Sequence, residues 1–164
     1  SEVVCMPQEA ILVLDNEPYI QLTLKALLET EKYFSITADT IEMALNHFSR
    51  YGISGLITEY RIDQVSTLDA IRDLKKRFPG VYVMMLTNGE VGGSEYEEII
   101  NAGVDDFFMK PFSSEKILLH LKKGLKQREI LLQKNRLEKE LNRVGMRRET
   151  QGGQVEGGLP PLSH

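Results

Sequence analysis

The sequence has little of several features that would assign it to a familiar class. It contains one cysteine, Cys5, so neither a disulfide nor a cysteine-based metal site can form within a single chain. Its longest apolar runs, Ala10 to Leu14 and Val81 to Leu86, are far shorter than the roughly 20 residues that a membrane span needs. We expect no signal peptide before them. We therefore expect no membrane insertion and a reducing, cytoplasmic setting.

Motifs of common ligand sites are also absent. No GxGxxG follows the first apolar run and no GxxxxGK[ST] occurs, which leaves a dinucleotide or P-loop site without support. The three histidines, His47, His120 and His164, are dispersed and have no metal-ligand companion at a useful spacing. The missing motifs thus argue against these two nucleotide sites and against a histidine metal site, and leave other cofactor sites open.

The net charge of −4 conceals an asymmetry. Residues 1–115 carry 9 Lys and Arg against 19 Asp and Glu, a net charge of −10. Residues 116–164 carry 11 against 5, a net charge of +6. A basic extension can contact nucleic acid, but this one has no helix-turn-helix companion and no compact second fold. We interpret it as a solvated helix whose long charged side chains cover its surface.

Short apolar runs alternate with helical patterns along the first part of the chain. The alternation predicts βαβ units and a parallel sheet with five helices, in the doubly wound order 2-1-3-4-5. Asp39 followed by Glu42, and Ser94 followed by Glu97, are typical of helix N-termini that are capped by a side chain. The five predicted strands lie at residues 11–14, 34–38, 55–58, 81–86 and 106–109.

The last predicted helix begins at Ser113 and continues far beyond the sheet, because residues 127–143 contain neither Gly nor Pro. Two apolar stripes along it could pair with a second copy, so a coiled coil is a candidate. One stripe consists of Ile130, Leu137, Leu141 and Val144, and the other of Leu118, Leu121, Leu125 and Leu132. We divide the chain into a flexible leader (1–8), one domain (9–125), a helical extension (126–148) and a disordered tail (149–164).

Polar residues follow four of the five predicted strands. Asp15 and Asn16 follow the first, Glu59 follows the third, Thr87 the fourth and Lys110-Pro111 the fifth. Because doubly wound sheets bind ligands at the carboxyl ends of their strands, these side chains should meet in one crevice.

In this order, and over residues 10–125, the segments resemble the receiver domain of two-component response regulators, which is switched by phosphorylation of one aspartate. The resemblance implies a flavodoxin-like fold and a non-enzymatic signalling module. The roles it implies are metal-site acids at Asp15 and Asn16, the phosphoacceptor at Glu59, a metal-binding backbone carbonyl at Arg61, switch residues at Thr87 and Phe107, and a phosphate-pairing lysine at Lys110 before a cis peptide to Pro111.

Two departures from the family pattern bear on this phosphate switch. Asn16 removes one acid from a site where Mg²⁺ favours carboxylate oxygens, so we expect Mg²⁺ to bind weakly and no cofactor to be required. Glu59 replaces the aspartate and moves its carboxylate about 1.5 Å further out, one carbon–carbon bond. That extension predicts an ion pair with Lys110 that imitates part of the activated arrangement. The loop from Ile62 to Thr67 also lacks the usual Pro and Gly.

Taken singly, these residues have plainer explanations. Asp15 and Asn16 could cap the next helix, Thr87 could be a turn residue and Glu59 a surface acid. Three functions stay open. The chain could be an atypical receiver that acts through protein–protein interaction, a conventional receiver that accepts phosphate on Glu59 or Asp63, or a structural dimerisation module.

The expected partners are proteins. They are a sensor kinase or another signalling protein, and a second copy of the chain bound through the last helices. Output should pass through the surface of the fourth helix, fifth strand and fifth helix, which includes Tyr96, Phe107 and Leu121. We expect no nucleic-acid contact by this chain.

Overall fold

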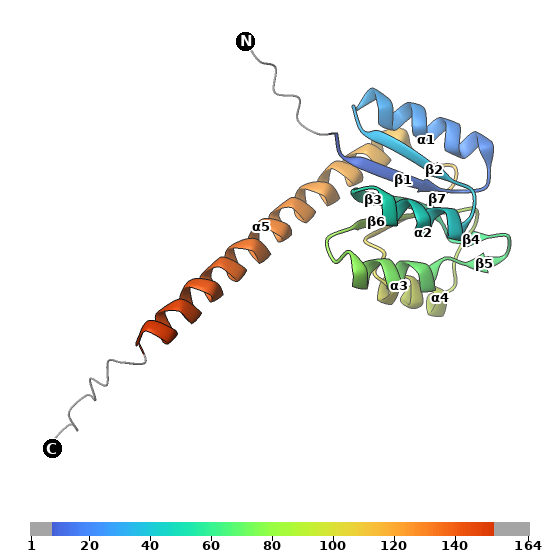
Figure 1. The fold of residues 1–164 in the computed structure, drawn as a ribbon. Helices are drawn as coiled ribbons and strands as arrows, with labels where there is room; N and C mark the ends of the chain where they lie inside the picture. Colours follow the sequence, from blue (N-terminus) through green and yellow to red (C-terminus); the bar gives the residue numbers. More distant parts are fainter. Residues whose placement is uncertain (1–7, 153–164) are drawn as a thin grey trace, which may run out of the picture. The chain divides into compact units, whose positions relative to one another are not determined.

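The computed structural model describes residues 8–152, with side chains described as far as Met146. One sheet of five parallel strands forms its centre, in the order β2-β1-β3-β6-β7 (Figure 1). This is the predicted order 2-1-3-4-5, and the flavodoxin-like α/β fold is confirmed. The strands span Ala10–Leu14 (β1), Phe34–Ala38 (β2), Ile53–Glu59 (β3), Tyr82–Thr87 (β6) and Asp106–Met109 (β7).

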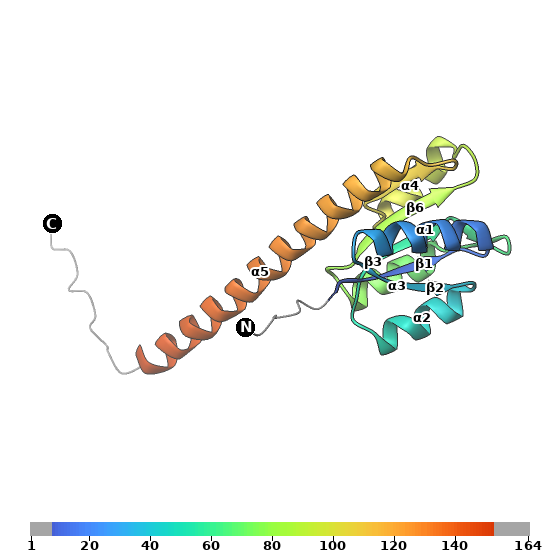
Figure 2. The ribbon, with the colours of Figure 1, turned by 90° about the horizontal axis from the view of Figure 1, so that it is seen from above.

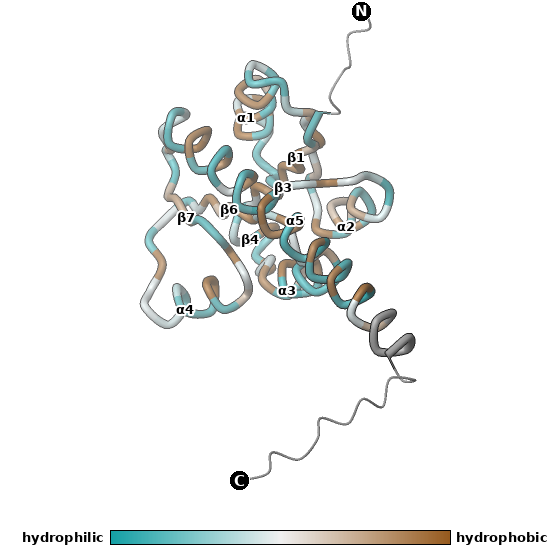
Figure 3. Tube along the Cα trace, turned by 90° about the vertical axis from the view of Figure 1, so that its left-hand side faces the viewer, coloured by the Kyte–Doolittle hydropathy of each residue, from teal (hydrophilic) through white to brown (hydrophobic). Residues whose placement is uncertain are grey.

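Five helices cover the two faces of this sheet (Figure 2). Ile20, Leu24 and Leu28 of α1 pack into one core cluster with the start of α5. The helices α2, α3 and α4 contribute to the cluster on the other face. Figure 3 shows hydrophobic and hydrophilic residues alternating along the helices, as expected where one side faces a core. The helices span Pro18–Thr30 (α1), Ile41–Arg50 (α2), Leu68–Arg77 (α3), Gly93–Ala102 (α4) and Ser114–Gly152 (α5).

The central strand β3 is buried over its whole length, including its polar residues Ser54, Thr58 and Glu59, as expected for a strand covered on both faces. It pairs with β1 on one side and β6 on the other. The three strands that carry Asp15, Glu59 and Thr87 near their carboxyl ends are therefore neighbours, and β7 brings Lys110 beside them. The sheet order alone gathers the four predicted segments at one edge.

Two predicted helix caps are wrong in position. The N-cap of α2 is Thr40, whose side chain accepts a hydrogen bond from the Met43 N–H at 3.1 Å. Asp39 instead accepts a hydrogen bond from the Gln21 side chain at 2.6 Å, a tertiary contact with α1. At the start of α4 no side chain caps the helix, since it already begins one residue before Ser94.

A small hairpin that was not predicted follows β3. The strands Arg61–Ile62 (β4) and Val65–Ser66 (β5) pair antiparallel, with the two residues Asp63 and Gln64 between them. Both turn residues have positive φ, 49° and 66°, as a tight two-residue hairpin turn requires. The altered loop that the sequence indicated is therefore an ordered β-turn.

Helix α5 runs without interruption from Ser114 to Gly152. The chain divides into the units Ser1–Glu129 and Ile130–His164, whereas the sequence analysis placed this boundary after residue 125. Residues 149–152 are helical, although disorder was predicted from residue 149. The rest of that tail and residues 1–7 of the leader lie outside the described residues. No helix in the described part is long and apolar enough to cross a membrane.

Candidate functional site

The site is a buried three-residue charge network at the carboxyl edge of the sheet. The Lys110 ammonium donates hydrogen bonds to Asp15 Oδ2 at 2.8 Å and to Glu59 Oε2 at 2.6 Å. All three side chains are nearly inaccessible, with 3% of Asp15, 7% of Glu59 and 7% of Lys110 exposed. The ion pair that the sequence predicted between Glu59 and Lys110 is thus present. Its partners lie 51 residues apart in the chain.

The remaining carboxylate oxygens are also engaged. Glu59 Oε1 accepts a hydrogen bond from the Tyr60 backbone N–H at 3.0 Å, and Asp15 Oδ1 accepts one from the Glu17 N–H at 2.9 Å. The Glu17 carboxylate lies 3.6 Å from the Lys110 ammonium at the exposed rim. Buried charges are tolerated when they are paired and hydrogen-bonded in this way.

The electrostatics of this network favour a charged lysine. Burial alone lowers the pKa of Lys110, but hydrogen bonds to Asp15 and Glu59, and the attraction of their charges, outweigh it and raise the pKa above its usual value. The ammonium is therefore positive throughout the ordinary pH range. One cation is shared between two carboxylates at the centre of the crevice.

The residues that could hold Mg²⁺ do not present a free set of carboxylate oxygens in this arrangement. The Asn16 side chain donates to Asp63 Oδ1 at 3.1 Å. The Arg61 side chain extends over the Tyr60 ring at 4.6 Å and pairs with Glu95 at 3.9 Å, contacts that do not involve the backbone carbonyl to which the resemblance assigns the metal role. Among the described residues, no three His, Cys, Asp or Glu side chains are grouped in a way that could hold a metal ion.

The two expected switch residues are positioned by separate contacts. Thr87 is buried, and its hydroxyl donates to the Gly89 carbonyl at 2.8 Å, within its own loop. Phe107 is partly buried and meets Tyr96 edge-to-face, with ring centroids 6.1 Å apart. The peptide between Lys110 and Pro111 is cis, as the family resemblance implied.

Sequence reasoning missed the supporting role of two side chains, Gln21 and Asp63, the second of which it had considered only as a phosphoacceptor. Gln21 donates to the Asp15 carbonyl and to Asp39, and so ties α1 to the loops that follow β1 and β2. Asp63 reaches Asn16 from the turn of the hairpin. A polar pair between Ile62 and Val65 could have indicated the hairpin, but no signal along the chain marked Gln21.

Comparison with known proteins agrees with this geometry. The family model "response regulator receiver domain" matches residues 11–122. The probable transcriptional regulatory protein TcrX of Mycobacterium tuberculosis is 27% identical over 117 residues, which are 71% of this chain and 50% of that protein. The alginate biosynthesis transcriptional regulatory protein AlgB of Pseudomonas aeruginosa is 26% identical over 138 residues, 84% of this chain and 30% of that protein. The chain spans about half or less of the length of these relatives.

Solved structures show the same fold. A CheY-like receiver domain protein from Methanospirillum hungatei superposes with a TM-score of 0.71 at 23% identity, over 75% of this chain and 98% of that one. The beryllofluoride-activated NtrC4 receiver domain dimer superposes with a TM-score of 0.67 at 26% identity, over 73% and 98%. Domains of this kind are generally non-enzymatic signalling modules that interact with sensor kinases and other signalling proteins. By the family match, the sheet order and the crevice, the chain belongs to the response regulator receiver domains of two-component signalling.

Proposed function

We propose that this chain is an atypical receiver that acts through protein–protein interaction, with Glu59 in the place of the phosphoacceptor aspartate. The observation that carries the proposal is the buried contact of 2.6 Å between Glu59 and Lys110. The resemblance implies that, in receiver domains, the lysine at the position of Lys110 pairs with the bound phosphoryl group. In this chain the lysine pairs with the Glu59 carboxylate, which supports the proposal that Glu59 substitutes for the phosphoryl group.

The geometry supports a weak nucleophile at Glu59. One carboxylate oxygen accepts from Lys110 and the other from the Tyr60 backbone, so attack on a phosphoryl donor would require breaking one of these bonds. The extra methylene also displaces the carboxylate, and a misplacement near 1 Å can lower a rate by about a hundredfold. Phosphorylation of Glu59 would thus be slow, and the ion pair would persist without phosphate.

We propose in addition that Mg²⁺ binds weakly and is not required. Both carboxylates of the network already accept hydrogen bonds from the protein. Mg²⁺ demands nearly ideal octahedral coordination by oxygen and gives up its water reluctantly. The amide of Asn16 adds no charge that would compensate for this.

A second copy of the chain is the proposed partner of the last helix. Ile130, Leu137, Leu141 and Val144 are 55%, 59%, 70% and 48% exposed. At 3.6 residues per turn they fall within an arc of about 60° on the helix. The NtrC4 receiver domain, a similar structure, is a dimer in its beryllofluoride-activated form. Such an exposed apolar stripe is suited to packing against the same stripe of a second helix. We propose that this pairing takes place in the reducing, cytoplasmic setting that the sequence favours.

The alternative stripe cannot serve this purpose. Leu121 and Leu125 are 0% and 4% exposed because they pack in the core of the receiver domain. For the same reason Leu121 cannot contribute to an output surface, as the sequence analysis had suggested. The exposed ring of Tyr96, which packs edge-to-face on Phe107, is the remaining aromatic part of that surface.

Amide NMR during titration with Mg²⁺ and then beryllofluoride, which mimics a phosphorylated carboxylate, tests the atypical-receiver proposal. We expect no saturable shifts around Glu59, Thr87 and Lys110 in the unaltered chain. In the variant Glu59→Asp combined with Asn16→Asp, both acids of the family pattern are restored, and we expect localised shifts at millimolar Mg²⁺. This variant is the positive control. Shifts in the variant would show that the assay can detect binding, so that silence in the unaltered chain is meaningful.

Two other results would contradict the proposal in different ways. Saturable shifts in the unaltered chain would mean that it is a conventional, phosphorylatable receiver. Silence in the restored variant, with a well-dispersed spectrum, would mean that the hairpin with Asp63, rather than Glu59, abolishes the site.

A further inference from the structure

Asn88 differs from the other five asparagines of the chain in the residue that follows it. It is the only one that precedes a glycine, Gly89, and it lies in the exposed loop between β6 and α4. An asparagine can deamidate when the backbone nitrogen of the next residue attacks its side-chain carbonyl carbon. Glycine favours this attack because it has no side chain in the way and its backbone moves freely. The sequence thus marks Asn88 as a candidate modification site.

The hydrogen bonding of the attacking nitrogen also sets Asn88 apart. Within the part of the chain that the structure describes, the Gly89 N–H donates to no acceptor. The Glu17 N–H, which follows Asn16, donates to Asp15 Oδ1 at 2.9 Å. The other four asparagines lie in helices, where the next N–H is held by the i→i−4 bond of the helix. They are Asn46 in α2, Asn101 in α4, and Asn135 and Asn142 in α5.

The surroundings of Asn88 leave room for the reaction. A Cβ atom at Gly89 would meet no described atom within 4 Å apart from its chain neighbours. Asn88 and Gly89 line a surface pocket of about 290 Å³ together with Glu59 and Thr87, so water can reach them. The side chain of Asn88 is held by one exposed hydrogen bond, from Nδ2 to Glu17 Oε1 at 2.9 Å. Such a bond is readily exchanged for bonds to water.

We propose that Asn88 deamidates spontaneously and that this change opens the rim of the crevice. The Gly89 nitrogen forms a bond to Asn88 Cγ, the Cγ–Nδ2 bond breaks, and the amide leaves as ammonia with the proton of the Gly89 N–H. Water then adds to the succinimide and opens it to aspartate or isoaspartate. One water is consumed and one ammonia is released, so the step needs no oxidant, reductant or cofactor.

Either product replaces a bridge across the rim by a repulsion. The Asn88 amide donates to Glu17, whose carboxylate lies 3.6 Å from the Lys110 ammonium. An ionised carboxylate at position 88 cannot donate, and two like charges at that separation repel each other. The isoaspartate product also adds one methylene to the backbone between Thr87 and Gly89, and so displaces the carbonyl that accepts from the Thr87 hydroxyl at 2.8 Å. These effects do not depend on whether Glu59 accepts phosphate.

Mass spectrometry of the full-length chain during incubation at mildly alkaline pH tests the proposal. Fragmentation assigns each mass change to one residue, which is needed because Asn88 and Asn101 share one tryptic peptide, residues 78–116. We expect Asn88 to deamidate at least about tenfold faster than Asn101 or Asn16, the factor that corresponds to the release of one hydrogen-bonded N–H. Equal rates at Asn88 and Asn16 would overturn the proposal.

Gly89→Ala tests the attacking nitrogen, and Gly92→Ala is its matched control. Both glycines lie between β6 and α4 with open space around them, so neither variant should disturb the fold. Only Gly89→Ala places a methyl group beside the nitrogen. It should slow deamidation at Asn88 by about tenfold or more, whereas Gly92→Ala should change the rate by less than about twofold. An unchanged rate in Gly89→Ala would overturn the mechanism.

Asn88→Asp tests the consequence at the rim, since it has the charge of the product. Asn88→Ala is the control, because it loses the bridge to Glu17 without adding a carboxylate. By amide NMR, the signals of Glu17 and Lys110 should shift further in Asn88→Asp than in Asn88→Ala. Equal shifts in the two variants would mean that the new charge does not act on the rim, and would overturn that part of the proposal.

Discussion

The buried contact between Glu59 and Lys110 can be weighed by a double-mutant cycle. Glu59→Gln keeps the shape of the side chain and removes its charge. Lys110→Met removes the ammonium and leaves an apolar chain of similar length. Together with the double variant they isolate the coupling between the two groups, which lie 2.6 Å apart and are each 7% exposed.

The expected magnitudes follow from what each variant leaves behind. Removal of one member of a buried ion pair costs about 3–5 kcal/mol. In Glu59→Gln the ammonium keeps Asp15 at 2.8 Å and the new amide oxygen can still accept, so we expect a loss near 2 kcal/mol, the scale of one charged hydrogen bond. Lys110→Met leaves Asp15 and Glu59 without a cation and should cost the full ~3–5 kcal/mol. The coupling energy should be about 1–2 kcal/mol.

Urea unfolding followed by tyrosine fluorescence is a suitable assay. The chain has 6 Tyr and no Trp, and every tyrosine precedes Glu129, so the signal reports on the receiver unit alone. The transition midpoint should fall while the slope with urea stays constant. A coupling energy below about 0.5 kcal/mol would refute the reasoning, since contacting charges in one network exceed that value.

The pH dependence of the same cycle gives a second check. The pKa of Lys110 is raised in the folded chain above its usual value of 10.5. A raised pKa means that folding favours the protonated form, so the stabilisation is present in full below pH 10.5 and is lost as the pH rises through the folded-state pKa. The coupling between Glu59 and Lys110 should therefore be constant at neutral pH and vanish only in strong alkali.

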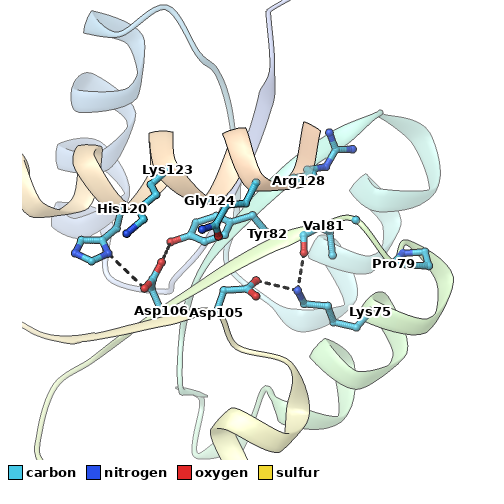
Figure 4. A pocket seen from close by; sticks show the side chains of 12 residues that line it. Lys75, Pro79, Val81, Tyr82, Asp105, Asp106, His120, Lys123, Gly124 and Arg128 are labelled. Atoms are coloured by element: carbon cyan, nitrogen blue, oxygen red, sulfur yellow. Dashed lines mark hydrogen bonds and ion pairs between the residues drawn. The ribbon is translucent and has the colours of Figure 1, made fainter. Parts of the chain in front are cut away.

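Three further outcomes can be measured. Burial is the main cause that raises the pKa of Tyr82, and its hydrogen bond to the Asp106 carboxylate adds to the effect (Figure 4). In an alkaline titration followed by absorbance, Tyr82 should therefore stay protonated after the exposed tyrosines have ionised. Ionisation of all 6 tyrosines together in the folded chain would contradict this. Gly124→Ala should destabilise the receiver unit by about 1–3 kcal/mol through the clash with Tyr82, whereas Gly145→Ala, with open space around it, should raise helicity. Leu141→Glu should abolish dimers in sedimentation equilibrium, while the same change at Leu132, on the opposite side of the helix, should not.

The architecture was predictable from the chain because its signals are local and repetitive. Five short apolar runs alternate with amphipathic helices, and right-handed crossovers between parallel strands leave few sheet orders. The positions of Asp15, Glu59, Thr87 and Lys110 in one crevice followed from the same rule, since each comes at the carboxyl end of a strand.

Errors arose where one residue had several partners within reach. Asp39 and Thr40 are both good N-caps, and the sequence analysis chose Asp39. The structure uses Thr40 because Asp39 bonds to Gln21, which is 18 residues away in the chain. The hairpin turn at Asp63 was missed since its sequence lacks the Asn-Gly or Asp-Gly signal that marks such turns.

By itself, then, the sequence determined the fold and the edge of the sheet where the charged residues meet, whereas the role of Glu59 in place of an aspartate stays a prediction. Only the tertiary structure decided which oxygen faces Lys110, that the Thr87 hydroxyl donates to Gly89, and that the Tyr82 ring lies against Gly124. The physical reason is the distance along the chain between the residues that interact. Strand and helix periods are read from neighbours in the chain, whereas the direction of a buried polar side chain is set by partners that may be 51 residues away.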